Sequence, residues 1–292
     1  SFRGVSPPVP PFIIKIKMKS NFVIDETKKK MLVELVKSGK NTLLTGPTGC
    51  GKTTLAIEIA EELDMKPVVI NCGSTQDARS SLIGYFTLKD GDTVFQEADF
   101  LKALQEPNTC IILDELSRAS DDAYNIVFPV LDFRRNIRVD EKDESREVAI
   151  ADNVNFISTA NIGVEYSSAR SIDRALQDRF LCFNLPYLRG TALKSYVGKQ
   201  FDRETASAAK DIFKIYDYSH KMFEQAKIST RMSTRMILEV MPLIKSFSVA
   251  EVLDNVLLSM FQQDSSAIIN DASVIKEYAD SLGVYNPVET NE

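Results

Sequence analysis

The amino-acid sequence predicts an α/β protein in which a parallel sheet is covered by helices on both faces, followed by a smaller helical domain. Three observations predict it. Short apolar runs alternate with helical stretches up to about residue 187. Beyond that point only helical periodicity continues. The 292 residues are 44% hydrophobic and 26% charged, which is enough apolar material for a folded core.

The N-terminal segment does not share this pattern. Its first twelve residues contain Pro7, Pro8, Pro10 and Pro11, which favour an extended chain. Apolar residues then alternate with lysines from Ile14 to Lys19, which predicts a short, half-exposed strand. We assign residues 1–24 to an N-terminal arm.

The α/β domain is expected over residues 25–187. Helical spacing of apolar residues predicts helices at 27–37 and 53–63. The expected parallel strands are four bounded apolar runs: 42–45, 67–71, 110–113 and 155–159.

The C-terminal helical domain is expected over residues 188–292. Its predicted helices are 206–225, 233–245, 249–262 and 272–282. Ser233 precedes an apolar helical run and is the predicted N-cap of its helix.

Composition excludes several classes of protein. The net charge of −6 argues against a nucleic-acid coat protein. No apolar run approaches the roughly 18 residues of a membrane span, and no secretory signal pattern is present. Four scattered cysteines and a single histidine predict reduced thiols and no zinc site, so a bound metal would have oxygen ligands. We therefore expect a soluble, cytoplasmic protein that does not contact a membrane.

A phosphate-binding loop is the most specific motif. It follows the first predicted strand of the sheet and opens a helix, as a GxxxxGK[ST] loop must. Its glycines let backbone N–H groups face phosphate oxygens, Lys52 would reach the β- and γ-phosphates, and the Thr53 hydroxyl would bind Mg²⁺. The alternative is a chance glycine-rich turn. The predicted nucleotide-binding residues are Gly46, Pro47, Thr48, Gly49, Cys50, Gly51, Lys52, Thr53 and Thr54.

Two carboxylates follow the apolar strand at 110–113. A buried parallel strand can deliver Asp114 beside a Mg²⁺ ion held by Thr53. Glu115 would then orient and polarise the attacking water. The alternative is an ordinary strand end followed by a solvated acidic turn.

Polar residues after the last predicted strand could complete the site. Asn161 could hold the same water or the γ-phosphate, or it could cap the next turn. Arg174 and Asp178 stand four residues apart on a predicted helix and could form a surface pair. Arg179, at the end of that helix, is the better candidate for a charge that reaches a phosphate.

The order of these motifs resembles an AAA+ ATPase, a P-loop NTPase, of the MoxR-like and dynein-related branch, which also holds the cobaltochelatase ATPase subunit. The resemblance covers roughly residues 25–245. It rests on the phosphate loop, the strand ending in Asp114-Glu115, and the DRALQDRF segment around Arg179. Asp114–Ala119 is similar to the DEISRA signature of this branch. Residues 84–95 resemble its first inserted hairpin and 131–150 its second.

The resemblance implies roles for the matching residues. Lys52, Thr53 and Asp114 would bind ATP and Mg²⁺, and Glu115 would be the catalytic carboxylate. Asn161 would be the first sensor. Arg179 would be an arginine finger that completes the site of a neighbouring subunit, assisted by Arg174. The second sensor would be Arg231 or Arg235, and we favour Arg235.

Two departures from the family pattern leave alternatives open. Cys50 lies inside the phosphate loop, where it either fills a variable position or gates nucleotide binding by oxidation. The charged stretch 140–147 lies at the expected tip of the second hairpin. It is either a solvated tip or a surface that faces a pore or client.

The function implied by the resemblance is Mg²⁺-dependent ATP hydrolysis by a hexameric ring that acts as a chaperone on a protein partner. A separately encoded von Willebrand A-type protein is the expected client. The alternatives are the ATPase subunit of a metal chelatase and an NTP-driven nucleic-acid motor. The acidic charge and the absence of an appended basic domain make nucleic acid the weaker choice.

Overall fold

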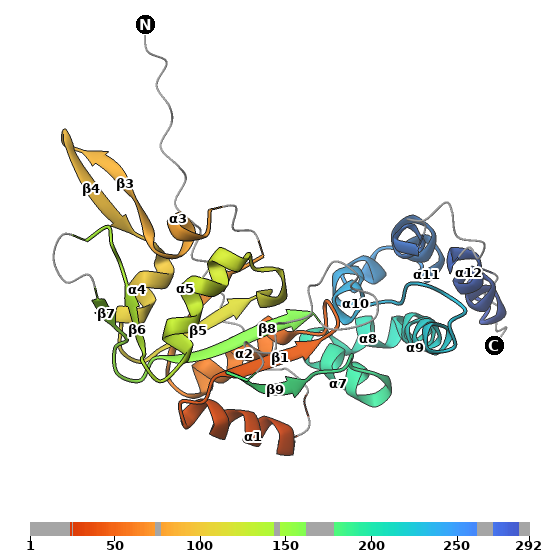
Figure 1. Ribbon diagram of the computed structural model, residues 1–292. Helices are drawn as coiled ribbons and strands as arrows, with labels where there is room; N and C mark the ends of the chain where they lie inside the picture. The colour runs from red at the N-terminus through yellow and green to blue at the C-terminus, as the bar shows by residue number, and fades with distance from the viewer. Residues whose placement is uncertain are drawn as a thin grey trace, which may run out of the picture.

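The computed structural model describes residues 24, 26–73, 77–142, 147–161, 178–261 and 271–285. Residues 1–23 of the arm predicted at 1–24, including the predicted strand at 14–19, lie outside the described residues. Figure 1 shows an α/β part joined to a part built only of helices. The helical part begins at Gly190. Among the described helices, none has both the length and the apolar character needed to cross a membrane.

The central sheet is parallel and has the strand order β2-β5-β8-β1-β9. Each of the four predicted strands is present, extended by one or two residues. The fifth, β9, was not predicted. The strands are β1 (Thr42–Gly46), β2 (Lys66–Asn71), β5 (Thr109–Asp114), β8 (Asn155–Asn161) and β9 (Leu181–Asn184).

Helices cover both faces of this sheet, as predicted. Alternate strand residues point to opposite faces, so Ile111 packs toward α4 and α5 whereas Ile112 packs toward α1 and α2. The helices described in this part are α1 (Glu26–Lys37), α2 (Lys52–Glu62), α3 (Ala78–Leu82), α4 (Asp99–Gln105) and α5 (Asp121–Leu131).

Two antiparallel hairpins are attached to the α/β part at the positions expected from the resemblance. β3 (Gly84–Lys89) pairs with β4 (Asp92–Glu97), and β6 (Asn136–Arg138) pairs with β7 (Glu147–Ala149). The β3–β4 hairpin projects away from the sheet (Figure 1).

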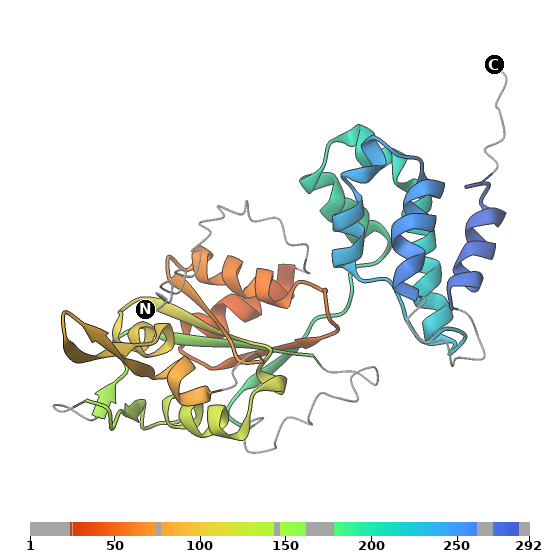
Figure 2. The ribbon, with the colours of Figure 1, turned by 90° about the horizontal axis from the view of Figure 1, so that it is seen from above.

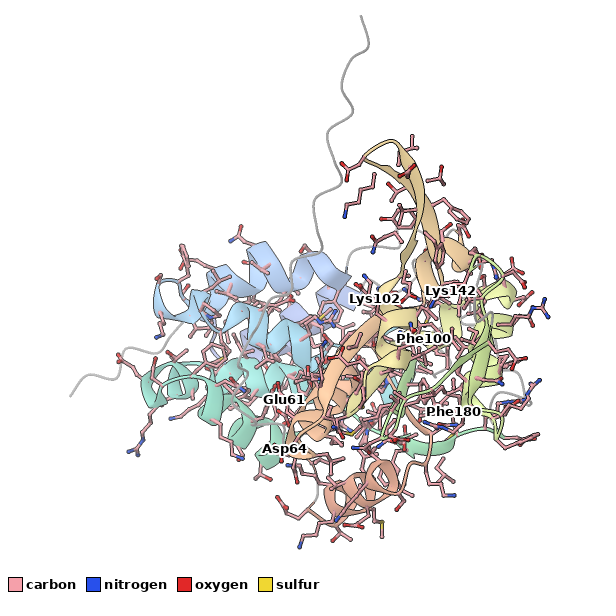
Figure 3. All side chains as sticks on the ribbon, turned by 90° about the vertical axis from the view of Figure 1, so that its left-hand side faces the viewer. Glu61, Asp64, Phe100, Lys102, Lys142 and Phe180 are labelled. Carbon is pink, nitrogen blue, oxygen red and sulfur yellow. The ribbon has the colours of Figure 1, made fainter. Side chains whose placement is uncertain are left out.

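Part of the charged tip of the second hairpin is held by ion pairs. The Arg79 guanidinium donates to both carboxylate oxygens of Glu141, at 2.5 and 2.8 Å. Figure 3 shows Lys142 near the base of the first hairpin, where its ammonium lies 2.5 Å from Glu97. The described part of this tip is therefore tethered rather than freely solvated, and residues 143–146 lie outside the description.

The helical part has its own hydrophobic core, and Figure 2 shows it standing beside the α/β part. The predicted single helix over 206–225 is wrong: it is two helices broken at Ala209. The helix predicted from Ser233 ends at Val240, because Pro242 cannot continue it. The elements are α7 (Gly190–Gln200), α8 (Arg203–Ala208), α9 (Lys210–Glu224), α10 (Thr234–Val240), η2 (Leu243–Lys245), α11 (Val249–Val252), the π-helical turn η3 (Leu253–Leu257), η4 (Leu258–Phe261) and α12 (Asp271–Ser281).

Candidate nucleotide-binding site

The phosphate loop connects β1 to α2 at the carboxyl edge of the sheet. Gly46 and Gly49 have φ values of 152° and 75°, in the region that favours glycine. A Cβ atom at Gly46 would overlap the Leu185 carbonyl oxygen. A Cβ at Gly49 would lie 3.0 Å from the Ser233 side chain. Gly46 is therefore favoured by both conformation and space, whereas Gly49 is favoured by its conformation and by the close Ser233 side chain.

Lys52 is the buried cation of the site, with a side chain anchored by three oxygen atoms. Its Nζ donates to the carbonyl oxygens of Gly46 at 3.0 Å and Pro47 at 2.8 Å. It also donates to Asn161 Oδ1 at 2.8 Å. Burial lowers the Lys52 pKa from its ordinary value, while Cys50 and Asp114 act in the opposite direction. These contacts bring the predicted Lys52 and Asn161 together.

Asp114 ends β5 and accepts two short hydrogen bonds on one oxygen. Thr53 Oγ1 and Thr159 Oγ1 each lie 2.6 Å from Asp114 Oδ1. Thr53 belongs to the first turn of α2, and Thr159 belongs to the neighbouring strand β8. The predicted pair Thr53 and Asp114 is thus in direct contact.

Glu115 follows in an unusual backbone conformation, with φ 54° and ψ 39°. Its N–H donates to Thr159 Oγ1 at 3.0 Å, and its carboxylate lies 3.2 Å from the Arg118 guanidinium. The side chain is 32% exposed. A non-glycine residue in this left-handed backbone conformation costs about 1 kcal/mol or more. The hydrogen bond from the Glu115 N–H to Thr159 helps to hold that conformation, and the conformation sets the direction of the carboxylate.

Thr159 was missed by the sequence reasoning. Its hydroxyl donates to Asp114 and accepts from the Glu115 N–H, so it fixes both acidic residues. The signal available in the sequence was its position, two residues before Asn161 and therefore on the same face of a strand adjacent to Asp114.

These side chains line one cleft, together with Arg235 from the helical part. The Arg235 N–H donates to the Gly49 carbonyl at 3.3 Å, and its side chain is exposed. The cleft is lined by Thr48, Gly49, Gly51, Lys52, Thr53, Thr54, Asp114, Glu115, Thr159, Asn161 and Arg235.

The donor set of this cleft fits a Mg²⁺-bound nucleotide. A hydroxyl and a carboxylate oxygen 2.6 Å apart, at Thr53 and Asp114, are hard ligands of the kind Mg²⁺ takes from proteins when phosphates and waters complete its shell. The glycines at 46 and 49 allow backbone close to a ligand, next to the N-terminus of α2.

Arg179, the predicted finger, lies elsewhere. Its guanidinium carbon is 4.8 Å from the Phe128 ring centroid, in a hollow that also includes Phe133 and Leu181. Arg174 lies outside the described residues. Of the two sensor candidates, Arg235 lines the cleft, whereas the Arg231 guanidinium lies over the rings of Tyr187 and Phe223.

Cys50 packs into the core between the sheet and α2, with 1% of its surface exposed. Burial raises the pKa of its thiol, which therefore stays protonated and poorly reactive. This environment favours the structural role that the sequence left open.

Comparisons with known proteins agree with this geometry. Residues 41–180 match the family described as an AAA domain of the dynein-related subfamily. Uncharacterized proteins of Staphylococcus aureus strains NCTC 8325 and COL are each 27% identical over 258 residues, which is 86% of this chain and 90% of theirs. The domain match supports an AAA+ ATPase.

Proposed function

We propose that the AAA domain at residues 41–180 hydrolyses ATP with Mg²⁺, and that the chain works as a MoxR-like ring that remodels a protein partner. The observation that carries the proposal is the hydrogen-bonded cluster joining the phosphate loop to two strand ends. In it Lys52 bonds Asn161, and Thr53 bonds Asp114.

Each residue of the cluster has a role in this proposal. Lys52 and the loop N–H groups bind phosphate oxygens, and Thr53 and Asp114 hold Mg²⁺. Bound Mg²⁺ neutralises charge on the phosphate oxygens. Glu115 accepts a hydrogen bond from the attacking water and so orients the water oxygen toward the γ-phosphorus. Asn161 holds the same water or the γ-phosphate. Arg235, on the helical side of the cleft, is the proposed second sensor.

The position of Arg179 supports a shared site. Since Arg179 does not line the cleft of its own chain, its role as a finger requires a neighbouring copy. Phe133 in the same hollow is 93% exposed, which suits a surface that another subunit covers. An arginine supplied in this way contributes about 10³–10⁵ in rate.

A protein client is supported by the first hairpin. Its strands expose large apolar side chains: Tyr85, Phe86, Leu88 and Val94. Together with the net charge of −6, this surface favours protein over nucleic acid, and a von Willebrand A-type protein remains our proposed client.

All four cysteines are free, so we place the protein in the reducing cytoplasm.

The experiment that tests the proposal measures ATP turnover per protomer against protein concentration. We expect turnover per protomer to rise with protein concentration. In Glu115→Gln and in Arg179→Ala we expect it to fall by a factor of about 100 or more. Mixing the two inactive variants should restore part of the activity, because some sites then combine an intact Glu115 with an intact Arg179. Full activity of Arg179→Ala alone would refute the shared site.

A further inference from the structure

Tyr187 connects the phosphate loop to the helical part. It follows Leu185 in the segment between β9 and α7. Its hydroxyl donates to the Thr48 carbonyl oxygen at 2.7 Å. This bond comes from outside the loop and fixes one of its peptide groups.

The Tyr187 ring is itself held in place by a stack from the helical part. The Arg231 guanidinium carbon lies 5.0 Å from the Tyr187 ring centroid and 4.4 Å from that of Phe223. The His220 ring meets Tyr187 edge-on at 5.0 Å. Each of these contacts restricts the direction in which the Tyr187 hydroxyl points.

The residues that follow Arg231 also contact the phosphate loop. The Met232 carbonyl is 2.9 Å from His220 Nε2, and the Arg235 N–H donates to Gly49 O at 3.3 Å. The Thr48 carbonyl is therefore held by Tyr187 and the Gly49 carbonyl by the helical part. Lys52 holds the two preceding carbonyls. Fixing the carbonyls fixes the peptide planes, and with them the N–H groups that face a ligand.

We propose that Arg231 is a positioning residue for nucleotide binding, acting through Tyr187 on the Thr48 peptide rather than by touching a phosphate. The inference rests on the proposed function, because it concerns the same cleft. It gives the two arginines different roles. Arg235 lines the cleft that would hold the nucleotide, and Arg231 sets the shape of the loop that would bind its phosphates.

Direct binding of ADP and of a non-hydrolysable ATP analogue, by titration calorimetry, tests this assignment. Tyr187→Phe removes only the hydroxyl and should weaken binding about fivefold, as expected for one neutral hydrogen bond. Arg231→Gln should weaken it by a similar factor of about three to ten. Because both changes act on one peptide, the double variant should bind little worse than either single variant.

The two nucleotides distinguish a positioning role from direct contact. Acting through Thr48, Arg231→Gln should weaken ADP and the ATP analogue by the same factor. In turnover assays it should raise KM and leave kcat nearly unchanged. Arg189→Gln is the matched control, since it removes an arginine of the helical side that pairs with Glu224 and does not stack on Tyr187.

Several results would overturn the inference. A loss confined to the ATP analogue, or additive losses in the double variant, would mean that Arg231 contacts the γ-phosphate directly. Unchanged affinities in Tyr187→Phe and Arg231→Gln would remove the linkage altogether, with the proposed function intact. If the unaltered protein binds neither nucleotide, the proposed function fails and this inference with it. Arg231→Lys, which keeps the charge without the planar stack, provides the same comparison if Arg231→Gln does not fold.

Discussion

Replacing Thr159 with valine removes one hydroxyl and keeps the shape of the side chain. In the structure this hydroxyl is the link between the two carboxylates of the site, because it donates to Asp114 and accepts the Glu115 N–H. The residue is 1% exposed, so water cannot readily replace the lost partner.

The size of the effect follows from these two contacts. A hydrogen bond to a charged group contributes about 1.5–3 kcal/mol, and a buried N–H left without an acceptor costs about 1–3 kcal/mol. Asp114 keeps its bond from Thr53, so we expect the free energy of unfolding to fall by about 2–4 kcal/mol. For 292 residues, at about 2.1 cal/mol/K of unfolding entropy per residue, that corresponds to a decrease in Tm of roughly 3–7 °C.

Activity should fall further than stability alone predicts. Without the Thr159 acceptor, the backbone at Glu115 can leave its left-handed conformation, and the carboxylate then moves away from the position it has in the native cleft. A misplacement of about 1 Å can cost about 100-fold in rate, so we expect kcat to fall about 10- to 100-fold with little change in KM. Thermal denaturation and steady-state ATP turnover measure the two effects separately.

Ser158→Ala is the control for this prediction. Ser158 is the preceding residue of the same strand and is equally buried, and its hydroxyl has no hydrogen-bond partner within the described part of the chain. Its removal should leave stability unchanged or slightly higher. If Thr159→Val behaves like Ser158→Ala in both assays, the hydroxyl does not position the acidic pair.

Two other predictions concern stability. Burial lowers the pKa of His220 to about 3, so between about pH 6.5 and 3 the unfolded chain binds a proton more readily than the folded one. The contribution of neutral His220 to the free energy of unfolding is therefore fully present above that range and should fall by about 1.4 kcal/mol for each pH unit of acidification within it. Urea titrations at several pH values should show a smaller slope for His220→Gln. Gly46→Ala should lower Tm by several degrees and abolish nucleotide binding, since its Cβ would overlap the Leu185 carbonyl oxygen, whereas Gly198→Ala, with open space around it in α7, should raise Tm slightly; equal Tm values for the two variants would contradict the steric argument.

The central strands were predictable because parallel strands buried on both faces read as continuous apolar runs. β9 was missed for the opposite reason: it is a four-residue edge strand, and Leu181 is 46% exposed. Its position follows from pairing with β1, which local pattern does not encode.

The candidate site divides in the same way. The phosphate loop is one continuous run of residues, so its spacing alone indicates its chemistry, whereas Asp114-Glu115 gains its meaning from following a buried strand in a chain that carries such a loop. The choice between Arg231 and Arg235 depends on how a distant helical segment meets the loop. The role of Thr159 depends on the register of β8 beside β5, which no single segment specifies.

The route of the chain from β9 into α7 has a practical consequence for dividing the protein. The matched AAA segment ends at residue 180, before β9, Leu185 and Tyr187. A fragment cut there would lose the strand that completes the sheet edge beside β1 and the backbone that lies under Gly46. The boundary drawn from sequence similarity is therefore not a boundary of folding. An isolated nucleotide-binding unit would have to extend at least through Tyr187, and even then the surface normally covered by Arg231 and Ser233 would be open to solvent.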